Sequence, residues 1–146
     1  MQISSMNRKT DFMSKRILVV ERSRTIQTLL SIYFRSAGHQ VLVCSTPQEA
    51  LRILADLHEA PDRIFLAVHA HEQDDYRLIQ YLKAQTAYAR TSLVALVLQE
   101  DMAQVQRRLR DTQVSYLAKP FRIQDALALV SVPIAGSVVP SETRRD

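Results

Sequence analysis

Several residue types are scarce in this chain of 146 residues, and their scarcity excludes whole classes of site. Only two glycines are present, Gly38 and Gly136, so the chain has no glycine-rich loop of the kind that wraps phosphate groups. The single cysteine, Cys44, cannot form an internal disulfide, which fits a reducing compartment. No apolar run approaches the roughly 20 residues that span a bilayer, and residues 1–14 lack the apolar core of a secretion signal. We therefore expect a cytoplasmic protein without membrane contacts.

The charge balance is mild, with a formal net charge of +4. Residues 1–14 supply one of these positive charges and residues 133–146 supply none, which leaves +3 for the part between them. A surplus of this size serves solubility and does not by itself indicate a nucleic-acid partner.

Short apolar runs recur along the chain, and each is followed by a helical pattern. The runs predict five strands, at Ile17–Val20, Val41–Cys44, Ile64–Val68, Leu93–Leu98 and Ser115–Ala118. After each run, apolar residues repeat every three or four positions, as on the buried face of a helix. Such strand–helix units build a parallel sheet with helices on both faces, and for five strands we expect the flavodoxin-like order 2-1-3-4-5.

The same pattern sets the expected domain boundaries. Residues 1–14 show no periodicity and are predicted to be a flexible leader. The strand–helix pattern fills residues 15–132, which is enough for one domain with an ordinary core. Residues 133–146 lose the pattern and are predicted to be a linker or tail.

In open α/β sheets, the working crevice lies beyond the carboxyl ends of the strands, here between strands one and three. The first predicted strand ends at Glu21 and Arg22, and the third ends at Ala67. Because the methyl group of Ala67 has no reactive atom, the central strand ends without a group that could perform chemistry.

Three segments carry a family resemblance: KRILVVERS, PDRIFLAVHA and YLAKPF, in this order. Together they resemble the receiver domain of bacterial two-component response regulators, over about residues 15–132. YLAKPF is the most specific of the three, because Lys-Pro directly after a short strand is a hallmark of receivers, in which the peptide between these residues is usually cis. The open-ended tail at residues 133–146 suggests that an output domain follows, or that the chain was cut there.

The resemblance implies a phosphorylation pocket with five parts. The acidic pair that binds Mg²⁺ corresponds to Glu21 and Arg22, the acceptor aspartate to Ala67, the hydroxyl residue to Val97, and the lysine to Lys119. Three of these positions, Arg22, Ala67 and Val97, lack the functional group that the family has there.

Each loss has a chemical consequence. The side chain of Ala67 cannot attack phosphorus, Arg22 offers a cation where Mg²⁺ needs an oxygen ligand, and Val97 has no hydroxyl for a phosphoryl oxygen. We therefore expect a pseudo-receiver that is not an enzyme, binds no Mg²⁺ and uses no other cofactor. In the emptied pocket, Lys119 is expected to form an ion pair with Glu21.

Other acidic residues and two histidines leave alternatives open. A conventional phospho-signalling receiver could use Asp74 or Asp75, although we expect both to cap the third helix. His69 and His71 follow the third strand, and His71 stands where the family often has proline. We interpret both as surface-loop residues, because a metal site needs three or four ligands.

The fourth predicted helix carries Arg107, Arg108 and Arg110. In receivers this helix, the fifth strand and the fifth helix form the surface that partners and dimer mates contact. Tyr116 occupies the aromatic switch position of that surface, and we expect its ring to rest inward. Arginine and tyrosine are enriched at interface hot spots.

The sequence thus favours a phosphorylation-independent module for regulatory protein–protein interaction or dimerisation in bacterial signal transduction. Its expected partner is a protein, its own output domain or a second copy. A basic nucleic-acid or nucleotide-binding module that uses the arginines of the fourth helix remains an alternative, with nucleic acid the less favoured partner.

Overall fold

The computed structural model of the chain describes residues 14–131. Apart from Ser14, the predicted leader and tail lie outside the described residues. Five parallel strands form one sheet in the order β2-β1-β3-β4-β5, which confirms the predicted fold class and strand order. The strands are β1 (Arg16–Val20), β2 (Gln40–Cys44), β3 (Arg63–Ala67), β4 (Ser92–Leu98) and β5 (Ser115–Lys119).

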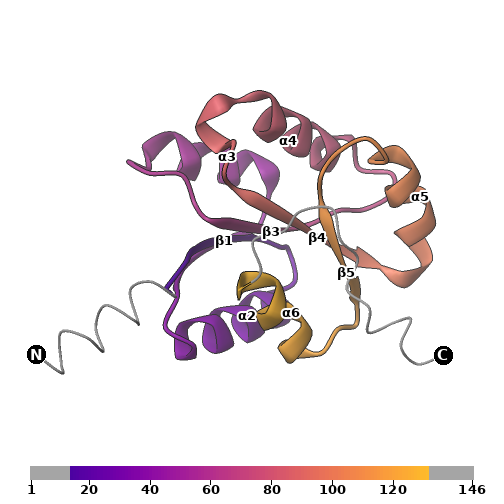
Figure 1. Cartoon of the computed structure of the whole chain (residues 1–146). Helices are drawn as coiled ribbons and strands as arrows, with labels where there is room; N and C mark the ends of the chain where they lie inside the picture. The colour runs from indigo at the N-terminus through magenta and orange to yellow at the C-terminus, as the bar shows by residue number, and fades with distance from the viewer. Residues whose placement is uncertain (1–13, 132–146) are drawn as a thin grey trace, which may run out of the picture.

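Helices cover both faces of this sheet. Figure 1 shows α2 and α6 on one face, and α3, α4 and α5 on the other. The α-helices are α2 (Arg24–Ser36), α3 (Pro47–Asp56), α4 (Gln73–Ala84), α5 (Met102–Arg108) and α6 (Ile123–Ser131), with 3₁₀ turns η1 (Thr86–Tyr88) and η2 (Gln99–Asp101). In residues 14–131 no helix combines the length and apolar character needed to cross a bilayer.

Local sequence signals explain where the first two helices begin and end. The Ser23 hydroxyl accepts a hydrogen bond from the Ile26 backbone N at 3.3 Å and so caps α2. After α2 ends, Gly38 adopts a φ of 96°, a left-handed conformation that glycine reaches without steric cost. The Thr46 hydroxyl accepts from the Glu49 backbone N at 3.1 Å and caps α3.

The central strand β3 is buried along its whole length, as its unbroken apolar run predicts. Its neighbours β1 and β4 run parallel to it, so the three carboxyl ends lie at one edge of the sheet. The expected cis peptide between Lys119 and Pro120 is present directly after β5.

The fourth helix is shorter than predicted. A 3₁₀ turn, η2, precedes α5, and α5 ends at Arg108, so Leu109 and Arg110 lie beyond the helix. Leu109 is still buried, because its backbone N continues the helical hydrogen bonding to Val105 O at 2.9 Å. Leu109 thus stays in the core although the helix ends one residue before it.

Candidate functional site

Four of the five predicted pocket positions lie close to the carboxyl edge of the sheet. Glu21 follows β1, Ala67 ends β3, Val97 is the penultimate residue of β4, and Lys119 ends β5. Glu21, Ala67 and Val97 are buried. The sheet therefore gathers the residues that the sequence predicted to share a pocket, and it buries an alanine at the end of the central strand.

A buried ion pair closes this pocket. Lys119 Nζ lies 2.8 Å from Glu21 Oε1, and the two side chains are 11% and 3% exposed. Because β3 and β4 separate β1 from β5 in the sheet, this ion pair joins two strands that are not neighbours. The expected pairing of Lys119 with Glu21 is thus confirmed.

Glu21 is held from other directions as well. Its Oε2 accepts a hydrogen bond from the Ser23 backbone N at 2.9 Å, and its carbonyl oxygen accepts one from Gln27 Nε2. Within residues 14–131, Oε1 accepts no hydrogen bond and has only its ion pair with Lys119. The neutralisation of this buried oxygen therefore depends on one lysine.

Arg22 is placed differently from the expectation that it shares the crevice with Lys119. Its side chain is exposed and forms no ion pair or hydrogen bond with any residue that the structure describes. The loop after β1 turns Glu21 inward and Arg22 outward. Arg22 therefore removes a metal ligand without putting a cation in the ligand's place.

His69 and Asp75 form a second polar pair next to the pocket. Asp75 Oδ2 accepts a hydrogen bond from the His69 backbone N at 3.0 Å and contacts His69 Nδ1 at 2.9 Å. The Asp75 side chain is only 4% exposed, and that of His69 is 33% exposed. His69 thus lies in the loop after β3, as predicted, but its ring is only partly exposed because a buried carboxylate holds it.

The predicted capping roles of Asp74 and Asp75 also need correction. The N-cap of α4 is Glu72, and no side chain makes a capping hydrogen bond there. Asp74 accepts from Gln48 at 2.9 Å and from Arg77 at 3.3 Å. Both aspartates lie in the first turn, where a carboxylate suits the helix dipole. Asp74 bonds to α3 and within α4, and Asp75 bonds to the loop residue His69.

The electrostatics of His69 follow from these contacts. The hydrogen bond to Asp75 is the largest influence and raises the pKa of His69 above its usual value, while burial acts in the opposite direction. The charges of Glu21 and Lys119 also affect this pKa, the first raising and the second lowering it. His69 is thus electrostatically coupled to the ion pair of the pocket.

No metal centre is formed around these groups in residues 14–131, where no three His, Cys, Asp or Glu side chains come together as ligands. His71 is exposed, and Cys44 is buried, with its pKa raised by burial to about 11. Of the pocket's groups, Glu21 could supply a metal with one carboxylate, and that carboxylate already binds Lys119 and Ser23.

Part of the predicted interaction surface is held in place by contacts within the domain. Tyr116 is buried, as expected, and its pKa is raised by burial and by Tyr76 nearby. Arg108 lies with its guanidinium carbon 4.1 Å from the centre of the Tyr76 ring, and its Nη2 donates to Gln73 Oε1 at 2.7 Å. Sequence reasoning missed this contact, which fastens α5 to α4.

Arg107 and Arg110 differ from Arg108. Both are exposed, and neither has an ion pair or a side-chain hydrogen bond within the described part of the chain. Of the three predicted interface arginines, these two are therefore available to a partner.

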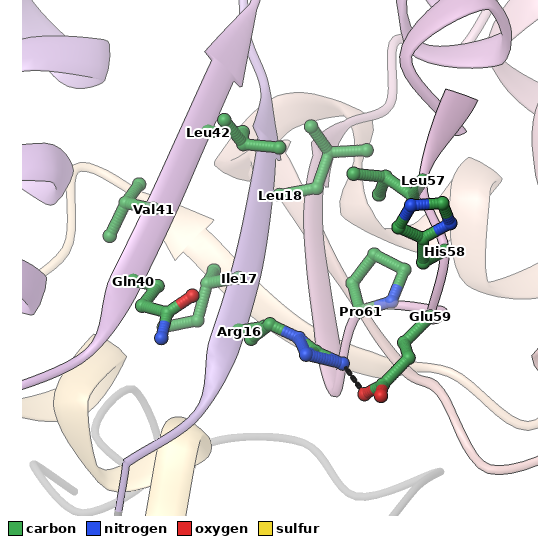
Figure 2. Close-up of a pocket in the computed structure, with 10 residues that line it drawn as sticks. All are labelled: Arg16, Ile17, Leu18, Gln40, Val41, Leu42, Leu57, His58, Glu59 and Pro61. Carbon is green, nitrogen blue, oxygen red and sulfur yellow. Dashed lines mark hydrogen bonds and ion pairs between the residues drawn. The ribbon is translucent and has the colours of Figure 1, made fainter. Parts of the chain in front are cut away.

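A hollow of about 420 Å³ lies at the opposite, amino end of the strands, and sequence reasoning did not find it. Figure 2 shows it between β1, β2 and the segment that precedes β3, with Leu18, Leu42, Leu57 and Pro61 as its apolar part. An ion pair between Arg16 and Glu59 lies at its rim. The lining therefore combines an apolar part with polar and charged side chains, among them His58 and Gln40.

Lys119→Ala should lower the stability of the domain. The substitution leaves Glu21 Oε1 buried without a partner, which costs about 1–3 kcal/mol and lowers the melting temperature by several degrees. Arg77→Ala is the matched control, because it removes an exposed ion pair worth less than about 1 kcal/mol. An equal melting temperature for wild type and Lys119→Ala would mean that the buried pair contributes nothing.

The stability should also depend on the protonation of His69. The pKa of His69 in the folded state lies above the unfolded value of about 6.5. The stabilisation that protonated His69 gives through Asp75 is therefore complete below about pH 6.5, and it is lost as the pH rises through the folded-state pKa. In urea unfolding, the difference in unfolding free energy between wild type and His69→Asn should therefore shrink as the pH rises above about 6.5.

In an NMR titration, the His69 midpoint should lie above about 6.5 and fall in Asp75→Asn. A wild-type midpoint at or below that value would contradict the claim that Asp75 raises the pKa of His69.

Comparison with known proteins identifies the fold's family. The family model for the response regulator receiver domain matches residues 17–131. The two-component response regulator ARR11 of Arabidopsis thaliana is 21% identical over 110 residues, which make up 75% of this chain and 20% of that protein. The chain thus spans about a fifth of the length of this relative.

Solved receiver structures have the same architecture. The signal receiver domain of a histidine kinase from Syntrophus aciditrophicus is 28% identical, with a TM-score of 0.69 and coverage of 80% of this chain and 86% of that one. CheY4 of Vibrio cholerae is 21% identical, with a TM-score of 0.66 and coverage of 79% of this chain and 97% of that one. The receiver domain of the sensor histidine kinase PA1611 from Pseudomonas aeruginosa was solved with a magnesium ion coordinated in its active-site cleft. It is 25% identical, with a TM-score of 0.64 and coverage of 80% of this chain and 94% of that one. The chain belongs to the response regulator receiver domain family.

Proposed function

We propose that this receiver domain works without phosphorylation, as a regulatory protein–protein interaction or dimerisation module in bacterial two-component signalling. The observation that carries the proposal is Ala67, which ends the buried central strand where the family has its acceptor aspartate. Lys119, the residue that would hold a phosphoryl oxygen, is engaged by Glu21 instead.

The metal chemistry of the family has little support in this pocket. Mg²⁺ requires several oxygen ligands in near-octahedral geometry. Of the acidic pair only Glu21 remains, and one of its oxygens faces Lys119 while the other accepts from Ser23. The exposed Arg22 supplies no oxygen. These contacts favour a domain that binds no Mg²⁺, needs no cofactor and catalyses no phosphoryl transfer.

The other possible acceptors fit phosphorylation poorly. Asp75 is buried and already bound to His69, so its attack on phosphorus would break that contact. Asp74 is engaged by Gln48 of α3 and by Arg77. A nucleic-acid role has no better support, because Arg108 is already bound to Tyr76 and Gln73.

The surface formed by α5, β5 and α6 is the proposed interface. Tyr116 is buried beneath it, so the surface does not depend on a switching ring. Arg107 and Arg110 are exposed next to it, and arginine readily forms hydrogen bonds with carboxylates of a partner. A fixed surface suits a constant contact, with an output domain or with a second copy of the chain.

Incubation with Mg²⁺ and acetyl phosphate should leave the intact mass of the protein unchanged, because the pocket lacks a nucleophile and keeps only Glu21 of the acidic pair. Mass spectrometry of the whole chain measures this directly. An added phosphoryl group that maps to Asp74 or Asp75 would contradict the proposal.

The variant Ala67→Asp with Arg22→Asp restores two missing carboxylates, and we expect it to bind Mg²⁺ more tightly than the wild type does.

Arg107→Glu with Arg110→Glu should abolish self-association without changing the circular dichroism spectrum, since both side chains are exposed and unpaired in the described chain. Sedimentation velocity should show a dimer for wild type and a monomer for the double variant. Arg90→Glu is the control, because Arg90 is exposed just before β4, at the other end of the sheet. A dimer in both variants would place the interface elsewhere.

A further inference from the structure

A polar hollow of about 440 Å³ lies beside the carboxyl end of β2, next to the pocket already described. Its walls come from the first turns of α2, from the end of β2 and from α3. The residues that line it are Arg24, Gln27, Val43, Cys44, Ser45, Glu49, Arg52 and Ile53.

Two of these residues, Arg24 and Arg52, are exposed arginines without partners. Neither forms an ion pair or a side-chain hydrogen bond with any of residues 14–131. Glu49, the acidic residue of the hollow, is not within ion-pairing distance of either arginine, and its Oε1 accepts from the Ser45 backbone N at 2.7 Å. The hollow therefore keeps a surplus of positive charge that the described residues do not neutralise.

This surplus distinguishes the hollow from the one in Figure 2. The two hollows have similar volumes, but Arg16 at the rim of the other is paired with Glu59, and the rest of that lining is largely apolar. An anion would have to displace Glu59 there. Beside β2, both guanidinium groups are free to bind one.

A neutral donor accompanies the two arginines. The Ser45 hydroxyl accepts from Gln27 Nε2 at 3.2 Å, which leaves its own hydrogen available for an acceptor in the hollow. Gln27 is itself buried, and the two hydrogens of its Nε2 are shared among the Ser45 hydroxyl and the carbonyl oxygens of Glu21 and Cys44. The hydroxyl is thus held in place by a side chain fixed to the ends of two strands.

We propose that this hollow binds a small phosphorylated molecule of about nucleotide size. Guanidinium groups recognise phosphate oxygens through paired, charge-assisted hydrogen bonds, and Arg24 and Arg52 approach the hollow from different helices. A volume of 440 Å³ lies in the range of small-molecule sites and exceeds what a single phosphate ion fills. The partly exposed Val43 and Ile53 provide apolar contact for the rest of the ligand. This site is separate from the emptied phosphorylation pocket and involves no covalent step.

Isothermal titration of the full chain with ADP, pyrophosphate and adenosine tests this proposal. ADP and pyrophosphate should bind saturably, ADP more tightly, and adenosine should not bind. Arg24→Gln and Arg52→Gln should each weaken ADP binding about tenfold, as expected for the loss of one charge-assisted contact. Arg90→Gln, which removes an equally exposed arginine outside the hollow, should change the affinity less than about twofold.

NMR amide shifts locate the bound ligand. ADP should shift Ser45 and Gln27, which line the hollow, and leave Arg90 unchanged. The proposal is overturned if ADP and pyrophosphate fail to bind at millimolar concentration, or if Arg90→Gln weakens binding as much as the other two variants. Binding of a phosphoserine peptide without binding of ADP would overturn the assignment to a small molecule.

Discussion

The buried ion pair between Glu21 and Lys119 is the interaction on which the rest of the pocket depends. A carboxylate that is 3% exposed is costly to keep charged, and the lysine 2.8 Å away neutralises it. The pair also joins the ends of β1 and β5 over the two strands between them. This edge is where the resemblance to receivers places the phosphorylation pocket, so the ion pair lies among the positions of that pocket.

Much of the fold could be predicted from the sequence because backbone pattern and burial determine it. The unbroken apolar run of β3 indicated a strand buried on both faces, and five strand–helix units led to the observed strand order. The pairing of Lys119 with Glu21 was also predictable, since parallel strands bring their ends together and a buried charge requires a partner.

The directions of exposed and loop side chains were harder to predict. Arg22 and Glu21 are adjacent in the sequence, yet the turn after β1 buries one and exposes the other. The contact of Asp75 with His69 depends on how the loop before α4 folds back, which no periodicity records. The position of Arg108 over the Tyr76 ring likewise depends on packing between two helices far apart in the chain.

The position of the ion pair in the chain has a consequence for synthesis. Glu21 is among the first residues of the domain to emerge from the ribosome and Lys119 among the last, so at usual elongation rates the acid waits roughly 5–20 s for its partner. Until β5 docks, the carboxylate must remain hydrated, which keeps this edge of the nascent sheet open to water. The last strand to be translated therefore completes the sheet, and a chain cut short before Lys119 lacks the cation that allows β1 to bury its acidic end.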